Sequence, residues 1–253
     1  MEQTTKIALI TGGSRGLGRN AALHIAKKGI DVIITYRSKK DEAEQVVAEI
    51  EQAGQKAAAL QLDTGVIKTF DAFSQQLTGI LKEKWGREHF DFLVNNAGIN
   101  APSPFGKTTE EDFDNLVNVH FKGVYFLTQT LLPVIADGGR IINFSSGLAR
   151  FSTPGYAAYA SMKGAIEVFT RYLAKELGPR KIAANVIAPG IIETDFTSEA
   201  FSNPGVKEHV SQITALGRPG LPDDIGGITA FLCTEDARWI NAQRIEASGG
   251  MNL

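Results

Sequence analysis

A chain of 253 residues is long enough to bury a large apolar core, and it fits one α/β domain, residues 1–253, better than two. The formal net charge is -2, with lysines and arginines scattered among carboxylates, which argues against nucleic acid or an anionic membrane as a partner. The N-terminal residues show no signal-peptide pattern and no apolar run has membrane-spanning length, so we expect a cytoplasmic protein that acts on a small molecule.

Cysteine and histidine, which often carry chemistry, are expected to be structural here. Cys233 is the only cysteine, so it forms no disulfide within the chain, and its apolar neighbours indicate a small core residue. The four histidines show no metal-ligand spacing, and we predict no metal site.

The first predicted elements are a strand at residues 6–11, a glycine-rich loop and a helix ending near residue 28. Gly12 allows a tight turn, Gly16 lets backbone N–H groups approach a pyrophosphate, and Gly18 permits close packing of the helix on the sheet. Glycine-rich turns also occur without ligands, but the place after a first strand favours a dinucleotide. The candidate contact residues in this loop are Gly12, Ser14, Arg15, Gly16, Leu17 and Gly18.

The end of the second predicted strand, residues 31–36, indicates which dinucleotide binds. A carboxylate that would bind a ribose 2′-hydroxyl is missing at Tyr36, Arg37 and Ser38. A guanidinium at Arg37 suits a 2′-phosphate, and Arg15 can close over the same group. We therefore predict NADP(H) and not NAD(H), the alternative being that both arginines are simply solvated.

Helices and strands continue to alternate along the chain, with helices at residues 40–53 and 66–85 and strands at 56–62 and 90–95. This order predicts a doubly wound parallel sheet with helices on both faces. Asp63 follows the third strand, where it meets the adenine or serves as an ordinary turn carboxylate. Asn95, Ala97 and Gly98 end the fourth strand at the same edge, and their small side chains let a ribose approach, although such residues are also common in turns.

The stretch from Ser145 to Lys163 is predicted to carry the chemistry. Residues 140–144 form a buried strand, and a helix rich in alanine begins at Tyr156 after a Pro-Gly turn. Tyr159 and Lys163 are one helical turn apart, so they share a helix face, and the strand end brings Ser146 to them. A phenol, an ammonium and a hydroxyl suit proton transfer to a carbonyl oxygen, and the ammonium should lower the pKa of the phenol. The alternative is that this pair is merely part of an amphipathic helix surface.

Two further segments flank this stretch. A helix opens at Thr109 with a capping-box pattern, and inside it Asn118 is a polar residue between valines that holds a water or a local bend. A strand at residues 181–188 ends in Pro189 and Gly190, and the mixed segment 191–216 is expected to be a mobile substrate lid. A helix from residue 222 to 232 and a strand beginning at Arg244 complete the chain.

With these motifs in order, the sequence resembles the classical short-chain dehydrogenase/reductase (SDR) family over nearly its whole length. The matches are Thr11-Gly12-x-x-x-Gly16-x-Gly18, Asn95-Asn96-Ala97-Gly98, Asn118, Ser146, Tyr159-x-x-x-Lys163, and Pro189-Gly190 with Thr194.

The resemblance implies a Rossmann fold with seven parallel strands, usually in a homotetramer. It implies a catalytic tetrad of Asn118, Ser146, Tyr159 and Lys163, in which Tyr159 donates the proton. Lys163 also binds the nicotinamide ribose, Asn118 holds a relay water and Thr194 meets the carboxamide. The candidate cofactor contacts outside the glycine loop are Tyr36, Arg37, Ser38, Asp63, Asn95, Ala97, Gly98, Tyr159, Lys163, Pro189, Gly190, Ile192 and Thr194.

Within the family the chain looks most similar to NADP-linked 3-oxoacyl-carrier-protein reductases and related carbonyl reductases, which interconvert ketones and secondary alcohols. Phe151, Ile192, Phe196 and Phe201 lie in the segments that shape substrate choice, so an apolar or aromatic carbonyl substrate is expected. Ala242 stands where relatives often have glycine, and this departure is expected to shift only the local backbone. The alternative function is a catalytically silent NADP-sensing protein that has kept the fold.

Overall fold

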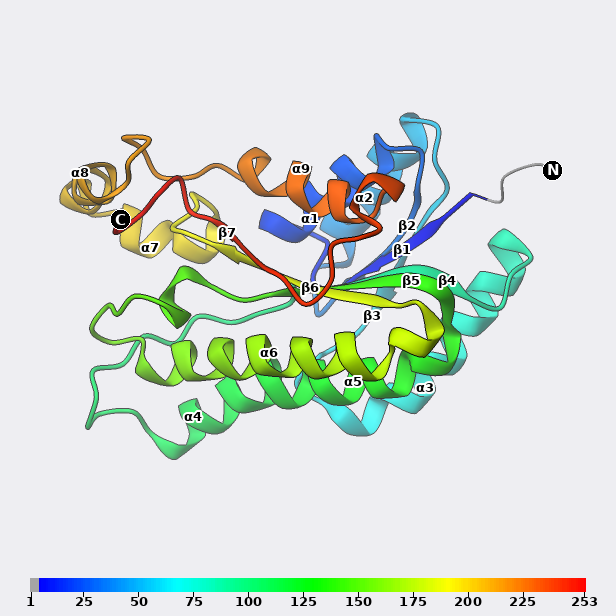
Figure 1. The fold of residues 1–253 in the computed structure, drawn as a ribbon, viewed down its shortest axis with the longest axis horizontal. Helices are drawn as coiled ribbons and strands as arrows, with labels where there is room; N and C mark the ends of the chain where they lie inside the picture. Colours follow the sequence, from blue (N-terminus) through cyan, green and yellow to red (C-terminus); the bar gives the residue numbers. More distant parts are fainter. Residues whose placement is uncertain (1–4) are drawn as a thin grey trace.

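The computed structural model describes residues 5–253. The first four residues, which belong to the N-terminal stretch considered for a signal peptide, lie outside this range. Its centre is one seven-stranded parallel sheet with the strand order β3-β2-β1-β4-β5-β6-β7 (Figure 1). The order reverses direction between β1 and β4, so a cleft for ligands is expected at the carboxyl ends of these strands. The strands are β1 Ile7–Ile10, β2 Asp31–Tyr36, β3 Ala57–Gln61, β4 Phe90–Asn95, β5 Ile135–Phe144, β6 Ala183–Pro189 and β7 Arg244–Ala247.

Helices cover both faces of the sheet, as the alternating pattern predicted. In Figure 1, α1, α2 and α9 lie above the sheet and α3, α4, α5 and α6 lie below it. Each face has its own apolar core, because the strands are buried on both sides. The helices are α1 Gly16–Ala26, α2 Lys40–Gln52, α3 Phe70–Ile80, α4 Glu110–Val117, α5 Gly123–Leu131, α6 Ala157–Glu176, α7 Ser198–Phe201, α8 Pro204–Ile213 and α9 Asp223–Leu232.

Two predicted elements differ from the observed ones. The helix predicted over 66–85 consists of a short 3-10 turn, then α3, and then a π-helical turn at Leu81–Trp85 that ends at Gly86 in the left-handed region, φ 63°. The fifth strand begins at Ile135 and not at Arg140, because the buried Ile135 pairs with Phe90 across an irregularity in the ladder. The Asp137-Gly-Gly sequence between them has the composition of a turn, which hides this pairing.

The segment expected to be a substrate lid is folded. It contains a 3-10 turn at Asp195–Thr197 followed by α7 and α8, which lie beside the C-terminal residues in Figure 1. Thr194 caps the 3-10 turn reciprocally with Thr197. Among the helices of residues 5–253, none combines the length and the apolar composition that crossing a bilayer requires.

Candidate active site

The structure brings Ser146, Tyr159 and Lys163 together below the carboxyl end of β5. Ser146 is the second residue after the strand, and its Oγ accepts a hydrogen bond from the N–H of Leu148 at 3.2 Å. Lys163 Nζ lies 5.5 Å from the centroid of the Tyr159 ring and donates to the carbonyl of Phe144 at 2.8 Å. One helical turn of α6 therefore presents the phenol and the amine to the strand end, as the spacing predicted.

Burial controls the ionisation of both groups on α6. It raises the pKa of the Tyr159 phenol above its ordinary value, and the Ser146 hydroxyl offsets part of that rise. It also lowers the pKa of Lys163 to about 7. The prediction of a lowered pKa at Tyr159 is therefore wrong, because loss of hydration disfavours the phenolate more strongly than the hydrogen bond from Ser146 favours it. A phenol that keeps its proton at neutral pH is suited to act as a general acid.

Asn118 lies where the helix below the site departs from α-helical geometry. It is the first residue of a π-helical turn, Asn118–Lys122, that joins α4 to α5. Such one-turn π segments frequently occur at functional sites because they change which backbone groups are available for hydrogen bonding. The π-helical turn is a local irregularity of the helix at Asn118, where a bend or a held water was predicted.

His120, two residues further on, is a site residue that the sequence analysis missed. Its side chain is buried, its ring packs edge-on against Tyr159 with 5.0 Å between centroids, and its Nε2 lies 2.8 Å from the carbonyl oxygen of Ile99. Burial, together with the nearby Lys163, lowers the pKa of His120 to about 3, so the ring is neutral. Its Nδ1 has no hydrogen-bond partner among residues 5–253. A histidine inside an apolar helical stretch was the only signal available in the sequence.

The glycine loop has the shape that a pyrophosphate needs. Gly12 and Gly16 have φ of 65° and 54°, a region that favours glycine, and a Cβ at Gly18 would collide with the carbonyl of Gly12. Helix α1 begins at Gly16 and has no acidic residue in its first turn, so its positive end is free for an anion. The turn is held by Thr35, whose Oγ1 accepts from the N–H of Gly12 at 3.2 Å. Ser14 and Leu17 lie in this loop and in the first turn of α1.

The arginines predicted to bind a 2′-phosphate lie at the exposed edge of this loop and of β2. Arg37 and Ser38 are exposed and directly follow Tyr36, the last residue of β2. Arg15 Nη1 lies 3.8 Å from Asp195 Oδ2, so the guanidinium joins the glycine loop to the segment after β6. Neither arginine is committed to a buried ion pair, and both remain available to an anion.

The fourth strand contributes to the site in a different way from the prediction. The side chain of Asn95 points into the core, where its Nδ2 donates to Asn143 at 2.8 Å and to Thr128 at 3.1 Å. The neighbouring Asn96, which was not among the candidates, donates through Nδ2 to the carbonyls of Thr11 and Gly12. Asn96 thus fixes the glycine loop to the strand that ends beside it. Ala97 packs against Gly12 of this loop, and Gly98 packs so closely on His120 that a Cβ there would lie 2.8 Å from its Cε1.

The remaining candidates border the same region. Asp63 Oδ1 accepts from the N–H of Gly65 at 2.9 Å, which is turn chemistry of the kind considered in the sequence analysis. Pro189 ends β6 and Gly190 packs against the backbone of Ser248. Ile192 is buried. Thr194 lies close to the glycine loop, because a Cβ added at Gly16 would be 3.9 Å from the Cβ of Thr194. A groove of about 550 Å³ runs along α1 past Glu193, Thr194 and Asp195.

Comparison with known proteins agrees with this geometry. A family model described as enoyl-(acyl carrier protein) reductase matches residues 12–252. An uncharacterized oxidoreductase of Methylorubrum extorquens is 38% identical over 97% of both chains. The tetrahydroxynaphthalene reductase PfmaG of Pestalotiopsis fici is 35% identical over 97% of this chain and 91% of its own. Among solved structures, the angucycline C-6 ketoreductase LanV with bound NADP has a TM-score of 0.93 and 40% identity, covering 98% of this chain and 96% of that one.

The chain belongs to the short-chain dehydrogenase/reductase family of oxidoreductases. The resemblance inferred from the sequence motifs is confirmed, and so is the doubly wound parallel fold with seven strands.

Proposed function

We propose that this protein is an NADP(H)-dependent ketoreductase that reduces a carbonyl group on a fused, partly aromatic ring system. The observation that carries the substrate class is the set of aromatic rings around the reactive phenol. The ring of Tyr156 lies 6.3 Å from that of Tyr159, and the ring of Phe196, from the segment after β6, lies 6.4 Å from it. Flat aromatic substrates pack favourably against such rings.

Similar proteins support this choice. PfmaG is a tetrahydroxynaphthalene reductase, and LanV is a C-6 ketoreductase of angucyclines that has also been solved with NADP and rabelomycin. Both align with this chain over almost its full length. The expectation of an apolar or aromatic carbonyl substrate, made from Phe151, Ile192, Phe196 and Phe201, is consistent with the aromatic compounds for which these relatives are named.

The residues of the site fit NADP(H). The glycine loop and the free end of α1 would hold the pyrophosphate, and Arg37 with Arg15 would hold the 2′-phosphate. When bound, the nicotinamide supplies the hydride. Lys163, deep in the site, would hold the nicotinamide ribose through its Nζ.

The proton chemistry follows from the burial of the three central side chains. Ser146 would donate a hydrogen bond to the carbonyl oxygen and so fix its position. Tyr159, whose pKa is raised by burial, would donate its proton to the same oxygen as negative charge develops there. Lys163, with a pKa near 7, would return a proton toward the phenol. Asn118, at the π-helical turn, would hold the relay water that the family resemblance implies.

The experiment that tests this function is NADPH oxidation measured over two substrate groups. One group contains fused-ring aromatic ketones and hydroxynaphthalenes, and the other contains 3-oxoacyl thioesters such as acetoacetyl-CoA. We expect a higher kcat/KM with the fused-ring group. A preference for the thioesters would support 3-oxoacyl reduction, and failure to oxidise NADPH with any carbonyl, while NADPH still binds, would support the silent NADP-sensing alternative.

We further propose a homotetramer whose interface includes the outer face of α4, α5 and α6, which lie together on one side of the sheet in Figure 1. Large apolar side chains remain exposed on this face, as a surface that contacts another copy would require. They are Phe113, Tyr125, Phe126, Val168 and Tyr172. Sedimentation analysis would test the assembly. The cytoplasmic location and the division into one domain with a lid near 191–216 stay predictions.

A further inference from the structure

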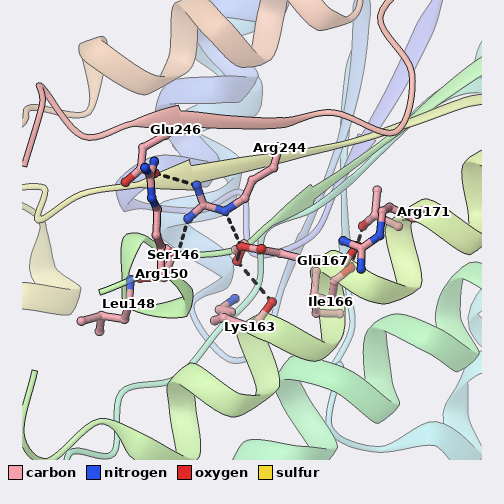
Figure 2. Close-up of polar contacts among 11 residues, drawn as sticks. Ser146, Leu148, Arg150, Lys163, Ile166, Glu167, Arg171, Arg244 and Glu246 are labelled. Carbon is pink, nitrogen blue, oxygen red and sulfur yellow. Dashed lines mark hydrogen bonds and ion pairs between the residues drawn. The ribbon is translucent and has the colours of Figure 1, made fainter. Parts of the chain in front are cut away.

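A charged network joins three elements directly behind the candidate catalytic side chains. Figure 2 shows Arg244, from β7, reaching toward the end of β5 and toward α6. Its Nε donates to Glu167 Oε1 at 2.6 Å, its Nη1 to Glu246 Oε2 at 2.6 Å, and its Nη2 to the carbonyl oxygen of Ser146 at 3.2 Å. One guanidinium therefore holds the backbone of Ser146 and the helix of Tyr159 and Lys163 at the same time.

Ser145 closes this network from the strand side. Its buried Oγ lies 2.7 Å from Glu167 Oε1 and 3.2 Å from the carbonyl oxygen of Lys163. Its N–H donates to the carbonyl of Ile187 at 2.8 Å, which anchors this end of β5 on β6. Glu167 Oε1 thus receives hydrogen bonds from both Ser145 and Arg244, one helical turn after Lys163.

The burial and charge of the network favour a fixed geometry. The side chains of Arg244 and Glu167 are only 22% and 16% exposed, so their contacts are screened less than those of surface pairs. Arg150 Nη1 lies 3.2 Å from Glu246, so the four side chains carry two positive and two negative charges. Of these four side chains, Arg244 is the one that hydrogen-bonds the carbonyl of Ser146, which also accepts from the N–H of Ala149 at 3.1 Å.

We propose that Glu167 and Arg244 are positioning residues that set the distance between the Ser146 hydroxyl and the Tyr159–Lys163 face of α6. The expected effect on turnover rests on the proposed function, whereas the expected effect on the geometry of the site does not. Among residues 5–253, neither side chain hydrogen-bonds the phenol, the amine or the glycine loop, so they act through the placement of β5 against α6. A displacement of about 1 Å in such a site lowers turnover by up to a hundredfold.

Three variants test the positioning role. Glu167→Gln keeps the size of the side chain and weakens its contacts to Ser145 and Arg244. Arg244→Met removes the contact to Ser146, and Arg244→Lys restores the charge without the planar fork. Glu246→Gln is the matched control. Like Glu167→Gln, it removes one negative charge beside the Arg244 guanidinium, but it leaves the hydrogen bonds from Arg244 to Ser146 and Glu167 in place.

We expect kcat to fall about ten- to a hundredfold in Arg244→Met and in Glu167→Gln, with partial recovery in Arg244→Lys. The Kd for NADPH should change less than kcat, because the glycine loop and Arg37, which would hold the pyrophosphate and the 2′-phosphate, contribute no residue to the network, although Lys163 would hold the ribose. Glu246→Gln should stay within about threefold in kcat. Equal losses in kcat for Glu246→Gln and Glu167→Gln would overturn the proposal, since charge alone would then explain both.

Crystal structures of the Glu167→Gln and Arg244→Met variants provide a readout that does not depend on activity. The distance between Ser146 Oγ and the Tyr159 hydroxyl should change from its wild-type value in both. An unchanged distance in both variants would overturn the positioning role even if the enzyme proves active. If no carbonyl substrate is found, a changed distance still supports the positioning role, while the proposed function alone fails.

Discussion

Replacing Lys163 with methionine should change how the stability of the protein depends on pH. Burial lowers the pKa of Lys163 from an ordinary value of 10.5 to about 7, because the buried ammonium loses its hydration. Between these two pH values the unfolded chain binds more protons at this residue than the folded chain, so stability rises with pH. At about 1.4 kcal/mol per pKa unit, the free energy of unfolding of the wild type should rise by roughly 4 kcal/mol relative to that of Lys163→Met as the pH is raised through this range.

The assay is urea unfolding of the cofactor-free protein at about pH 6.5, 8.0 and 9.5. Methionine also leaves the Phe144 carbonyl without its donor, but that cost does not depend on pH and shifts all three measurements equally. Below about pH 7 both states bind the proton, and the difference between the two proteins should level off. Lys175→Met, at an exposed position of α6, is the control and should follow the wild type. The same free-energy difference between wild type and Lys163→Met at every pH would refute the reasoning.

Two further predictions concern other parts of the chain. Arg37→Asp should lower the ratio of kcat/KM for NADPH over NADH by about ten- to a hundredfold or more, because a guanidinium–phosphate contact is replaced by repulsion; an unchanged ratio would exclude Arg37 as the phosphate ligand. Ala242 has φ 58°, which costs a non-glycine residue roughly 1 kcal/mol, so Ala242→Gly should leave the free energy of unfolding nearly unchanged or raise it. Ala48→Gly, in the interior of α2, should instead lose about 1 kcal/mol, and equal losses for the two variants would contradict the strain at Ala242.

The fold could be predicted from the sequence because its elements are patterned locally. The strands at 31–36 and 90–95 have the predicted bounds, since each is an apolar run with a clear end. The placement of Cys233 in the core follows from its apolar neighbours and is confirmed by its burial, which raises the pKa of the thiol to about 12. The start of β5 was missed because its pairing with Phe90 is a long-range contact that no local pattern encodes.

The parts of the central site that depend on the spacing of residues along the chain could be predicted. The turn that relates Tyr159 to Lys163 and the strand end that carries Ser146 are local features, and the structure brings them together. The direction of the pKa shift at Tyr159 was wrong because it depends on burial, which spacing alone does not reveal. An opposite charge nearby was visible in the sequence, whereas the loss of hydration was not.

The supporting residues were out of reach for a different reason. Glu167 and Arg244 are separated by 77 positions, and only the adjacency of β6 and β7 and the packing of α6 place them together. The contact of His120 with Tyr159 likewise joins two different helical segments. Hydrogen-bonded pairs of this kind depend on tertiary structure, and a single sequence carries no period or motif that marks them.

The measurement that tests the central claim most directly compares Tyr159→Phe with Tyr156→Phe in NADPH-dependent reduction of a fused-ring ketone. Both changes remove one hydroxyl from neighbouring rings, but only Tyr159 lies beside Ser146 and Lys163. We expect Tyr159→Phe to lose about a hundredfold or more in kcat while its Kd for NADPH stays near the wild-type value, and Tyr156→Phe to keep most of its turnover. A Tyr159→Phe enzyme with more than about a tenth of wild-type kcat would contradict the assignment of Tyr159 as the proton donor.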